Sequence, residues 1–170
     1  MKASNFFRPK LYILTFFIII FFNINSYSQS ESYTKYYNSR FGFSFLHPNS
    51  FKLLDAPENG DGQEFQSQDE KFYIISYGGN DNYDAFKDIN KRYSEDQLLY
   101  DEITYKKLFD NFYVLSGINK GEIFYLKKYV GEVCTNVIEM RYPIKFKSDF
   151  DDIVKTISKS FKSGNLSEFH

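Results

Sequence analysis

Histidine and cysteine, which often act as bases, nucleophiles or zinc ligands, are scarce in this sequence of 170 residues. They occur as His47, His170 and Cys134. A zinc site needs three or four ligands of these types, so we expect no zinc and no other cofactor. A serine or cysteine nucleophile would need His47 as its base. A hydrolase that uses His47 with Ser44 or Cys134 is the catalytic alternative, although no Gly-x-Ser-x-Gly motif supports it.

An acidic turn at residues 57–62 has the sequence Pro-Glu-Asn-Gly-Asp-Gly and resembles part of a calcium loop. The first ligand position of such a loop would be Pro57, and the closing glutamate would be Gln68, so a plain acidic turn is the better interpretation. Turns on a rigid sheet often carry recognition residues. We therefore consider this turn and its neighbouring rings a possible partner loop, against the alternative of a solubilising hairpin; its residues are Glu58, Asn59, Asp61, Phe51 and Phe65.

The N-terminal residues predict export. Three basic residues precede an apolar run at 11–22, and the run is too short for a membrane-spanning helix of about 20 residues. We expect a signal peptide at 1–28, cleaved between Ser28 and Gln29, so that the chain meets the membrane only before cleavage. Removing three basic residues and no acidic residue changes the net charge from −1 to −4, which disfavours nucleic acid as a partner. Another envelope or secreted protein is the expected partner.

The mature chain has the length and composition of one globular domain, with 42% hydrophobic and 25% charged residues. Residues 29–39 are expected to be a lead-in segment, residues 40–163 the domain, and residues 164–170 a flexible tail. Phe41, Phe43 and Phe45 alternate along a predicted strand at 41–46, so their rings should share one buried face. Cys134 shares a strand face with apolar residues and should be a small buried side chain, unable to form an internal disulfide.

Alternation of apolar residues and turn signals predict the other elements. Short strands are expected at 51–54, 63–67 and 71–77, followed by a helix at 83–93 with Asn82 as its N-cap and a further helical turn at 94–100. Four longer strands at 103–109, 112–119, 122–130 and 132–142 should form an antiparallel meander. A last helix should begin near Ser148 and end at 163–164, with an apolar stripe of Phe150, Ile153, Val154, Ile157 and Phe161. This order predicts the α+β class, with helices packed on an antiparallel sheet.

Aromatic side chains alternate on two of the predicted strands. Tyr125, Lys127 and Tyr129 follow Ile123 on one, and the second carries Tyr73, Ile75 and Tyr77. If helices cover these faces, the rings belong to the core; if a face is open, it is a ring-lined platform for a small ligand or glycan.

Several short motifs, in this order, resemble the PsbP-like family. They are Arg40-Phe41-Gly42-Phe43-Ser44-Phe45 with His47-Pro48, the turn at 57–62 before Phe65-Gln66-Ser67, Tyr77-Gly78, Val114-Leu115-Ser116-Gly117, Met140-Arg141-Tyr142-Pro143 and Ile157-Ser158-Lys159-Ser160-Phe161. The resemblance implies an α-β-α sandwich and a non-catalytic role, because members of this family bind other proteins or assist assembly of larger complexes. It therefore implies an exported protein-binding or assembly module of the cell envelope.

Overall fold

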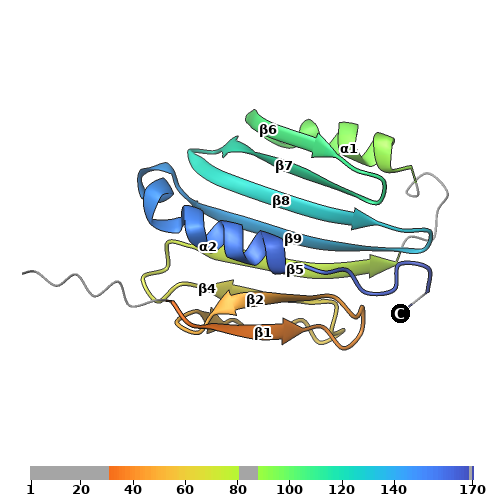
Figure 1. Cartoon of the computed structure of the whole chain (residues 1–170), viewed down its shortest axis with the longest axis horizontal. Helices are drawn as coiled ribbons and strands as arrows, with labels where there is room; N and C mark the ends of the chain where they lie inside the picture. The colour runs from red at the N-terminus through yellow and green to blue at the C-terminus, as the bar shows by residue number, and fades with distance from the viewer. Residues whose placement is uncertain (1–30, 81–87, 169) are drawn as a thin grey trace, which may run out of the picture. The chain divides into compact units, whose positions relative to one another are not determined.

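The computed structural model describes residues 31–80, 88–168 and 170, which belong to a unit spanning Glu31–His170. Its main feature is a seven-stranded antiparallel sheet of order β3-β4-β5-β9-β8-β7-β6 (Figure 1). The strands are β3 (Lys52–Leu53), β4 (Gly62–Gln66), β5 (Tyr73–Asn80), β6 (Glu102–Leu108), β7 (Phe112–Asn119), β8 (Glu122–Val130) and β9 (Cys134–Pro143). A separate antiparallel pair is formed by β1 (Tyr33–Tyr37) and β2 (Ser44–Pro48). The helices are α1 (Ile89–Gln97) and α2 (Lys147–Ser160), the latter preceded by the 3-10 turn η2 (Ile144–Phe146).

Two hydrophobic clusters show that both faces of the large sheet are covered. On one face, residues of β5 and β9 pack with the β2 segment and with α2. On the other face, residues of β7, β8 and β9 pack with Ile89 and Tyr93 of α1 and with Tyr100 and Ile103. The chain is therefore an α+β protein with helices on both sides of an antiparallel sheet, as predicted.

The first cluster is built from rings. Phe41, Phe43 and Phe45 are each at most 1% exposed, which confirms the predicted buried face. From α2, Val154 and Ile157 are buried, and Phe161 follows the helix as a fully buried ring. The apolar stripe predicted for the last helix is thus confirmed, and it attaches α2 to the sheet by burial of apolar area.

The N-terminal boundary of the domain differs from the prediction. Residues 33–37 were expected in a lead-in segment, but they form β1 and pair with β2. β2 itself begins at Ser44 rather than at Phe41, because Gly42 has a φ of +70° and turns the chain. The Asn38 carboxamide closes this turn by accepting from the Phe41 amide at 2.7 Å.

The helix boundaries also differ. α1 is one helix that continues through residue 94, where a second helical turn was predicted, and its N-cap is Asp88, which accepts from the amides of Asn90 and Lys91. The predicted N-cap Asn82 lies outside the described residues, as does the start of the helix predicted there. α2 begins at Lys147 without a side-chain cap, since η2 leads directly into it.

The C-terminal segment was predicted to be flexible, and the structure gives it several fixed contacts. The Gly164 amide donates to Asn136 Oδ1 at 2.9 Å, and the Leu166 carbonyl accepts from the Val133 amide at 3.2 Å. Leu166 also packs against the first cluster. These contacts attach residues 164–166 to β9 and to the turn that precedes it.

The predicted signal peptide lies outside the described residues. In the ranges that the structure does describe, no helix is both long and apolar enough to cross a membrane.

Gly78 and Gly79 are neighbours on β5 that face opposite sides of the sheet, and they should respond very differently to alanine. A Cβ on Gly78 would lie 2.1 Å from Cγ of the Phe41 ring, whereas a Cβ on Gly79 would meet only Thr135 Oγ1 at 3.6 Å. We expect Gly78→Ala to destabilise the domain by about 2–3 kcal/mol through overpacking. Gly79→Ala should change stability by less than about 0.5 kcal/mol. Urea unfolding of the two variants checks this, and equal effects would contradict the packing of Phe41 on β5.

Candidate functional site

The acidic turn at residues 57–62 does not carry the apolar patch that was predicted beside it. Phe51 is 6% exposed and Phe65 is fully buried, so both rings belong to the core. Asp61 forms an ion pair with Arg40 at 2.6 Å, and the Arg40 guanidinium also donates to the Asn59 carbonyl at 2.8 Å. Both rings and the Asp61 carboxylate therefore make contacts within the domain. Phe65 is buried because strand alternation points its ring toward β2. A partner-binding role of Glu58, which is exposed, stays a prediction.

The same turn shows no arrangement suited to calcium. The Asp61 carboxylate is occupied by Arg40 and by the Asn59 carboxamide, and the Gly60 amide donates to the Pro57 carbonyl. In the described ranges, no group of three or more His, Cys, Asp or Glu side chains could hold a metal ion.

His47 is placed for packing. It is 6% exposed, its ring centroid lies 4.6 Å from that of Phe65, and its Nδ1 is 3.0 Å from the Pro48 carbonyl. Phe65, which His47 contacts, pairs with Ile74 on β5. Cys134 pairs with Asn80, which is six residues further along β5. Cys134 is therefore about 20 Å from Phe65, too far from His47 for a hydrogen bond. Ser44 is three residues from His47 on β2, so the two side chains point to opposite faces. The structure therefore brings together neither pair of the hydrolase alternative.

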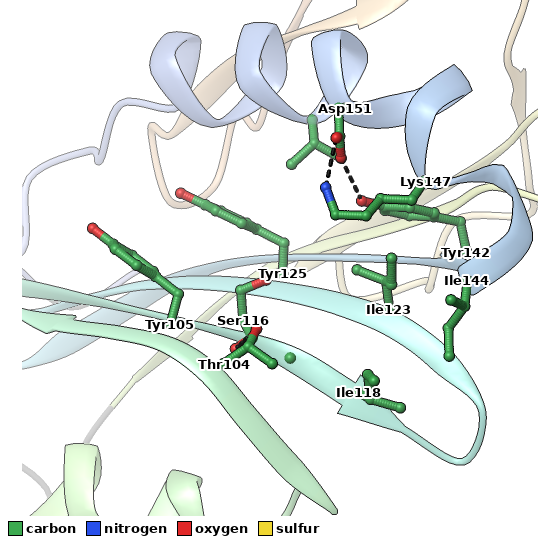
Figure 2. Close-up of a pocket in the computed structure, with 12 residues that line it drawn as sticks. Thr104, Tyr105, Ser116, Ile118, Ile123, Tyr125, Tyr142, Ile144, Lys147 and Asp151 are labelled. Carbon is green, nitrogen blue, oxygen red and sulfur yellow. Dashed lines mark hydrogen bonds and ion pairs between the residues drawn. The ribbon is translucent and has the colours of Figure 1, made fainter.

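A groove lies beside α2, on the α2 face of β6, β7 and β8. Its wide end has a volume of about 360 Å³. The floor there is formed by Ile118 and Ile123, and Ile144 and Val154 line it from η2 and α2. Figure 2 shows the rings of Tyr105 and Tyr125 side by side, with both hydroxyls directed away from the isoleucine side chains. The wide end is thus apolar, and its two tyrosines lead into the rest of the groove.

A polar group bounds the wide end on the α2 side. Lys147 Nζ pairs with Asp151 at 2.6 Å, and the Tyr142 hydroxyl donates to the same carboxylate at 3.5 Å (Figure 2). Burial, with a smaller contribution from Asp151, raises the pKa of Tyr142 to about 12. Because the lysine and the carboxylate neutralise each other, this rim offers little net charge to a ligand.

The hydroxyl groups in the floor are already used by the main chain. Ser116 Oγ donates to the Phe124 carbonyl at 2.8 Å, and Thr104 Oγ1 donates to the Ser116 carbonyl at 3.3 Å. Among the described residues no histidine lines the groove, and the Asp151 carboxylate at its rim is paired with Lys147. The two hydroxyls therefore support the main chain of the floor, and the groove offers mainly apolar and aromatic surface to a ligand.

A second, narrower end continues the groove along α2. It has a volume of about 250 Å³ and shares Tyr105 and Tyr125 with the wide end. Its walls are Phe109, Phe112 and Val114 on the sheet side and the last turn of α2 on the other, with the lysines 127 and 159. Burial raises the pKa of Tyr125 and lowers that of Lys127, which Lys162 lowers further.

The sequence identified part of this groove. Tyr125 and Lys127 were predicted on one strand face. That face was expected to be core if a helix covered it, and a ligand-binding platform if it was open. α2 covers this face over β9 and part of β8. Tyr125 and Tyr129 both pack against the first cluster, and Tyr125 also lines the groove. Tyr105 was missed, although it is 51% exposed and forms the outer wall. The other predicted platform, with Tyr73 and Tyr77, lies on the opposite face of the sheet and is partly exposed.

Comparison with known proteins agrees with this architecture. The solution structure of cyanobacterial PsbP (CyanoP) from Synechocystis sp. PCC 6803 matches with a TM-score of 0.57 at 15% sequence identity, covering 78% of this chain and 93% of that chain. No protein-family model and no curated protein sequence matches. The chain has a PsbP-like fold, and at this identity the likeness shows the fold alone.

Proposed function

We propose that this protein is an exported, non-catalytic binding module of the cell envelope, which holds a segment of a partner protein in the groove beside α2. The observation that carries the proposal is the groove itself. It is lined mainly by apolar and aromatic side chains, and the Ser116 and Thr104 hydroxyls in its floor donate to main-chain carbonyls. Sites of this kind bind a ligand mainly by burying its apolar groups.

The shape of the groove favours an extended segment. On β7 its floor runs from Phe112 to Ile118, a distance of about 20 Å. About six residues of extended chain span that distance. Both ends of the groove open to solvent and adjoin at Tyr105 and Tyr125, so a segment of a folded partner can lie in it without threading. Tyr105 and Tyr125, which belong to both ends, are the side chains that such a segment must touch.

Photo-crosslinking tests this proposal. p-Benzoylphenylalanine replaces Tyr105 in one purified protein and Tyr77 in another, and each is irradiated with an envelope extract. The two positions are matched, because Tyr105 is 51% and Tyr77 is 41% exposed on opposite faces of the sheet. We expect a discrete protein adduct only from position 105.

A variant of the groove makes the result specific. Ile144 is 44% exposed at the wide end, and Ile144→Asp should reduce the adduct at position 105 at least about tenfold by placing a charge against apolar side chains. Leu53→Asp, at a 57% exposed site on β3, is the control and should leave the adduct intact. Identical adducts from positions 105 and 77, or an adduct that Ile144→Asp does not weaken, would overturn the proposal.

A further inference from the structure

The narrow end of the groove is positively charged, in contrast to the apolar wide end. Lys127 and Lys159 line it, and Lys107 extends over the Phe109 ring at 4.7 Å. Within the described ranges, none of these three lysines forms an ion pair with a carboxylate. The groove therefore has a direction: apolar at Ile118 and Ile123, and cationic at the end of α2.

Lys127 is a buried lysine at the narrow end of the groove. It is 8% exposed, and its Nζ lies 5.0 Å from the ring centroids of Phe112 and Tyr129. The ammonium donates to the carbonyls of Ser158 and Phe161, at 3.3 and 3.4 Å, at the C-terminal end of α2, and the Phe161 carbonyl also accepts from the Tyr129 hydroxyl at 3.5 Å. An ammonium has three donors, so one is left for a ligand in the groove that Lys127 lines.

A buried positive charge with no anionic partner favours an anion at this point. The carbonyl groups supply only partial negative charge, and Lys159 adds a second, exposed ammonium beside them. A carboxylate that entered the narrow end would meet Lys127 and Lys159 in a partly desolvated site, where charge-assisted hydrogen bonds are stronger than in water. The Lys147–Asp151 pair at the wide end offers no such attraction, because its charges cancel.

We propose that the groove recognises an extended peptide segment with apolar side chains at one end and acidic side chains at the other, the apolar part lying on Ile118 and Ile123 and the carboxylates lying at Lys127 and Lys159. This inference rests on the proposed function and adds the chemistry of the bound segment and the end of the groove at which its charged side chains lie. Charge complementarity selects the acidic partner, and the open length of about six residues selects a peptide over a compact small molecule.

Binding of synthetic hexapeptides to the intact chain tests the inference. The probe has leucines at one end and glutamates at the other, and its matched control has glutamines in place of the glutamates. NMR reports the Tyr105 and Lys159 signals, and calorimetry gives the affinity. We expect the glutamate peptide to bind at least about tenfold more tightly than the glutamine peptide.

A pair of variants on α2 locates the charge effect. Lys159→Glu should weaken binding of the glutamate peptide at least about tenfold, and Lys155→Glu should not, because Lys155 is exposed one turn earlier and does not line the groove.

The inference is supported when the glutamate peptide shows this difference. It is overturned if both peptides bind equally, if neither shifts the groove signals, or if decanoate binds there and the glutamate peptide does not. Equal binding of both peptides would leave the groove as a protein-binding site, whereas loss of the position 105 adduct described above would remove the proposed function itself.

Discussion

Replacing Ile157 by aspartate is expected to abolish folding of this domain. Ile157 is fully buried and lies in the middle of the α2 stripe that packs on β9. Truncating a buried isoleucine costs about 2–5 kcal/mol, and an unpaired carboxylate in the same place adds several kcal/mol. Because a domain of this size is stable by only about 5–15 kcal/mol, the sum removes most or all of the native stability.

Circular dichroism and thermal unfolding check this expectation. Ile157→Asp should show no cooperative transition, whereas the control Lys155→Asp, at an exposed position of the same helix, should melt like the wild type. A normal transition in Ile157→Asp would show that α2 does not pack through this residue. It would also displace the groove, because α2 forms one of its walls.

Local patterns were sufficient to predict most of the sheet. The bounds of β7 and β8 agree with the prediction because their turn is encoded by the residues that form it: Lys120 has a φ of +51° and Gly121 a φ of +81°, which is the tight hairpin connection. The α2 stripe was predicted for a similar reason, since a helical period of apolar residues is a property of the segment alone.

The groove could not be predicted in this way, because it depends on where α2 stops covering the sheet and on a local irregularity in β6. The register of β6 against β7 shifts between Ile103 and Tyr105. Regular alternation would place these two side chains on one face. After the shift, Ile103 packs in the second cluster beside α1, whereas Tyr105 lines the groove beside α2. The predicted apolar patch beside the acidic turn was wrong because it was inferred from nearness in the sequence. Phe51 and Phe65 are close to the turn along the chain, but packing against distant residues buries their rings.

Buried tyrosines should make the domain unfold at alkaline pH. Tyr113 is fully buried and donates to the Asp96 carboxylate, and Tyr142 is 2% exposed beside Asp151. Burial, with these carboxylates, raises the pKa of Tyr142 to about 12 and that of Tyr113 further. An unfolded tyrosine has a pKa of about 10, so above that pH the unfolded state releases protons that the folded state keeps. Stability contributed by these groups is complete below pH 10 and is lost as the pH rises.

The size of this loss is large for so few residues. Each pH unit above about 10 costs up to about 1.4 kcal/mol per such tyrosine, so two of them remove about 5 kcal/mol by pH 12. Lys127 acts in the opposite direction, because its lowered pKa makes stability rise with pH, but that contribution is complete near pH 10.5, where the unfolded lysine also becomes neutral. The tyrosines therefore dominate at higher pH.

Urea unfolding at a series of pH values, with phenolate absorbance as a second signal, measures the effect. The matched variant is Tyr113→Phe with Tyr142→Phe, in which Asp96 keeps its ion pair with Lys128 and Asp151 keeps its pair with Lys147. At neutral pH this variant should be less stable by about 1 kcal/mol, mainly through the lost hydrogen bond to Asp96. Above pH 10 its stability should fall less steeply than that of the wild type, so that the two curves cross; the remaining fall comes from other tyrosines of raised pKa, such as Tyr100 and Tyr125. Parallel curves would show that these two phenols ionise as readily in the folded domain as in the unfolded chain.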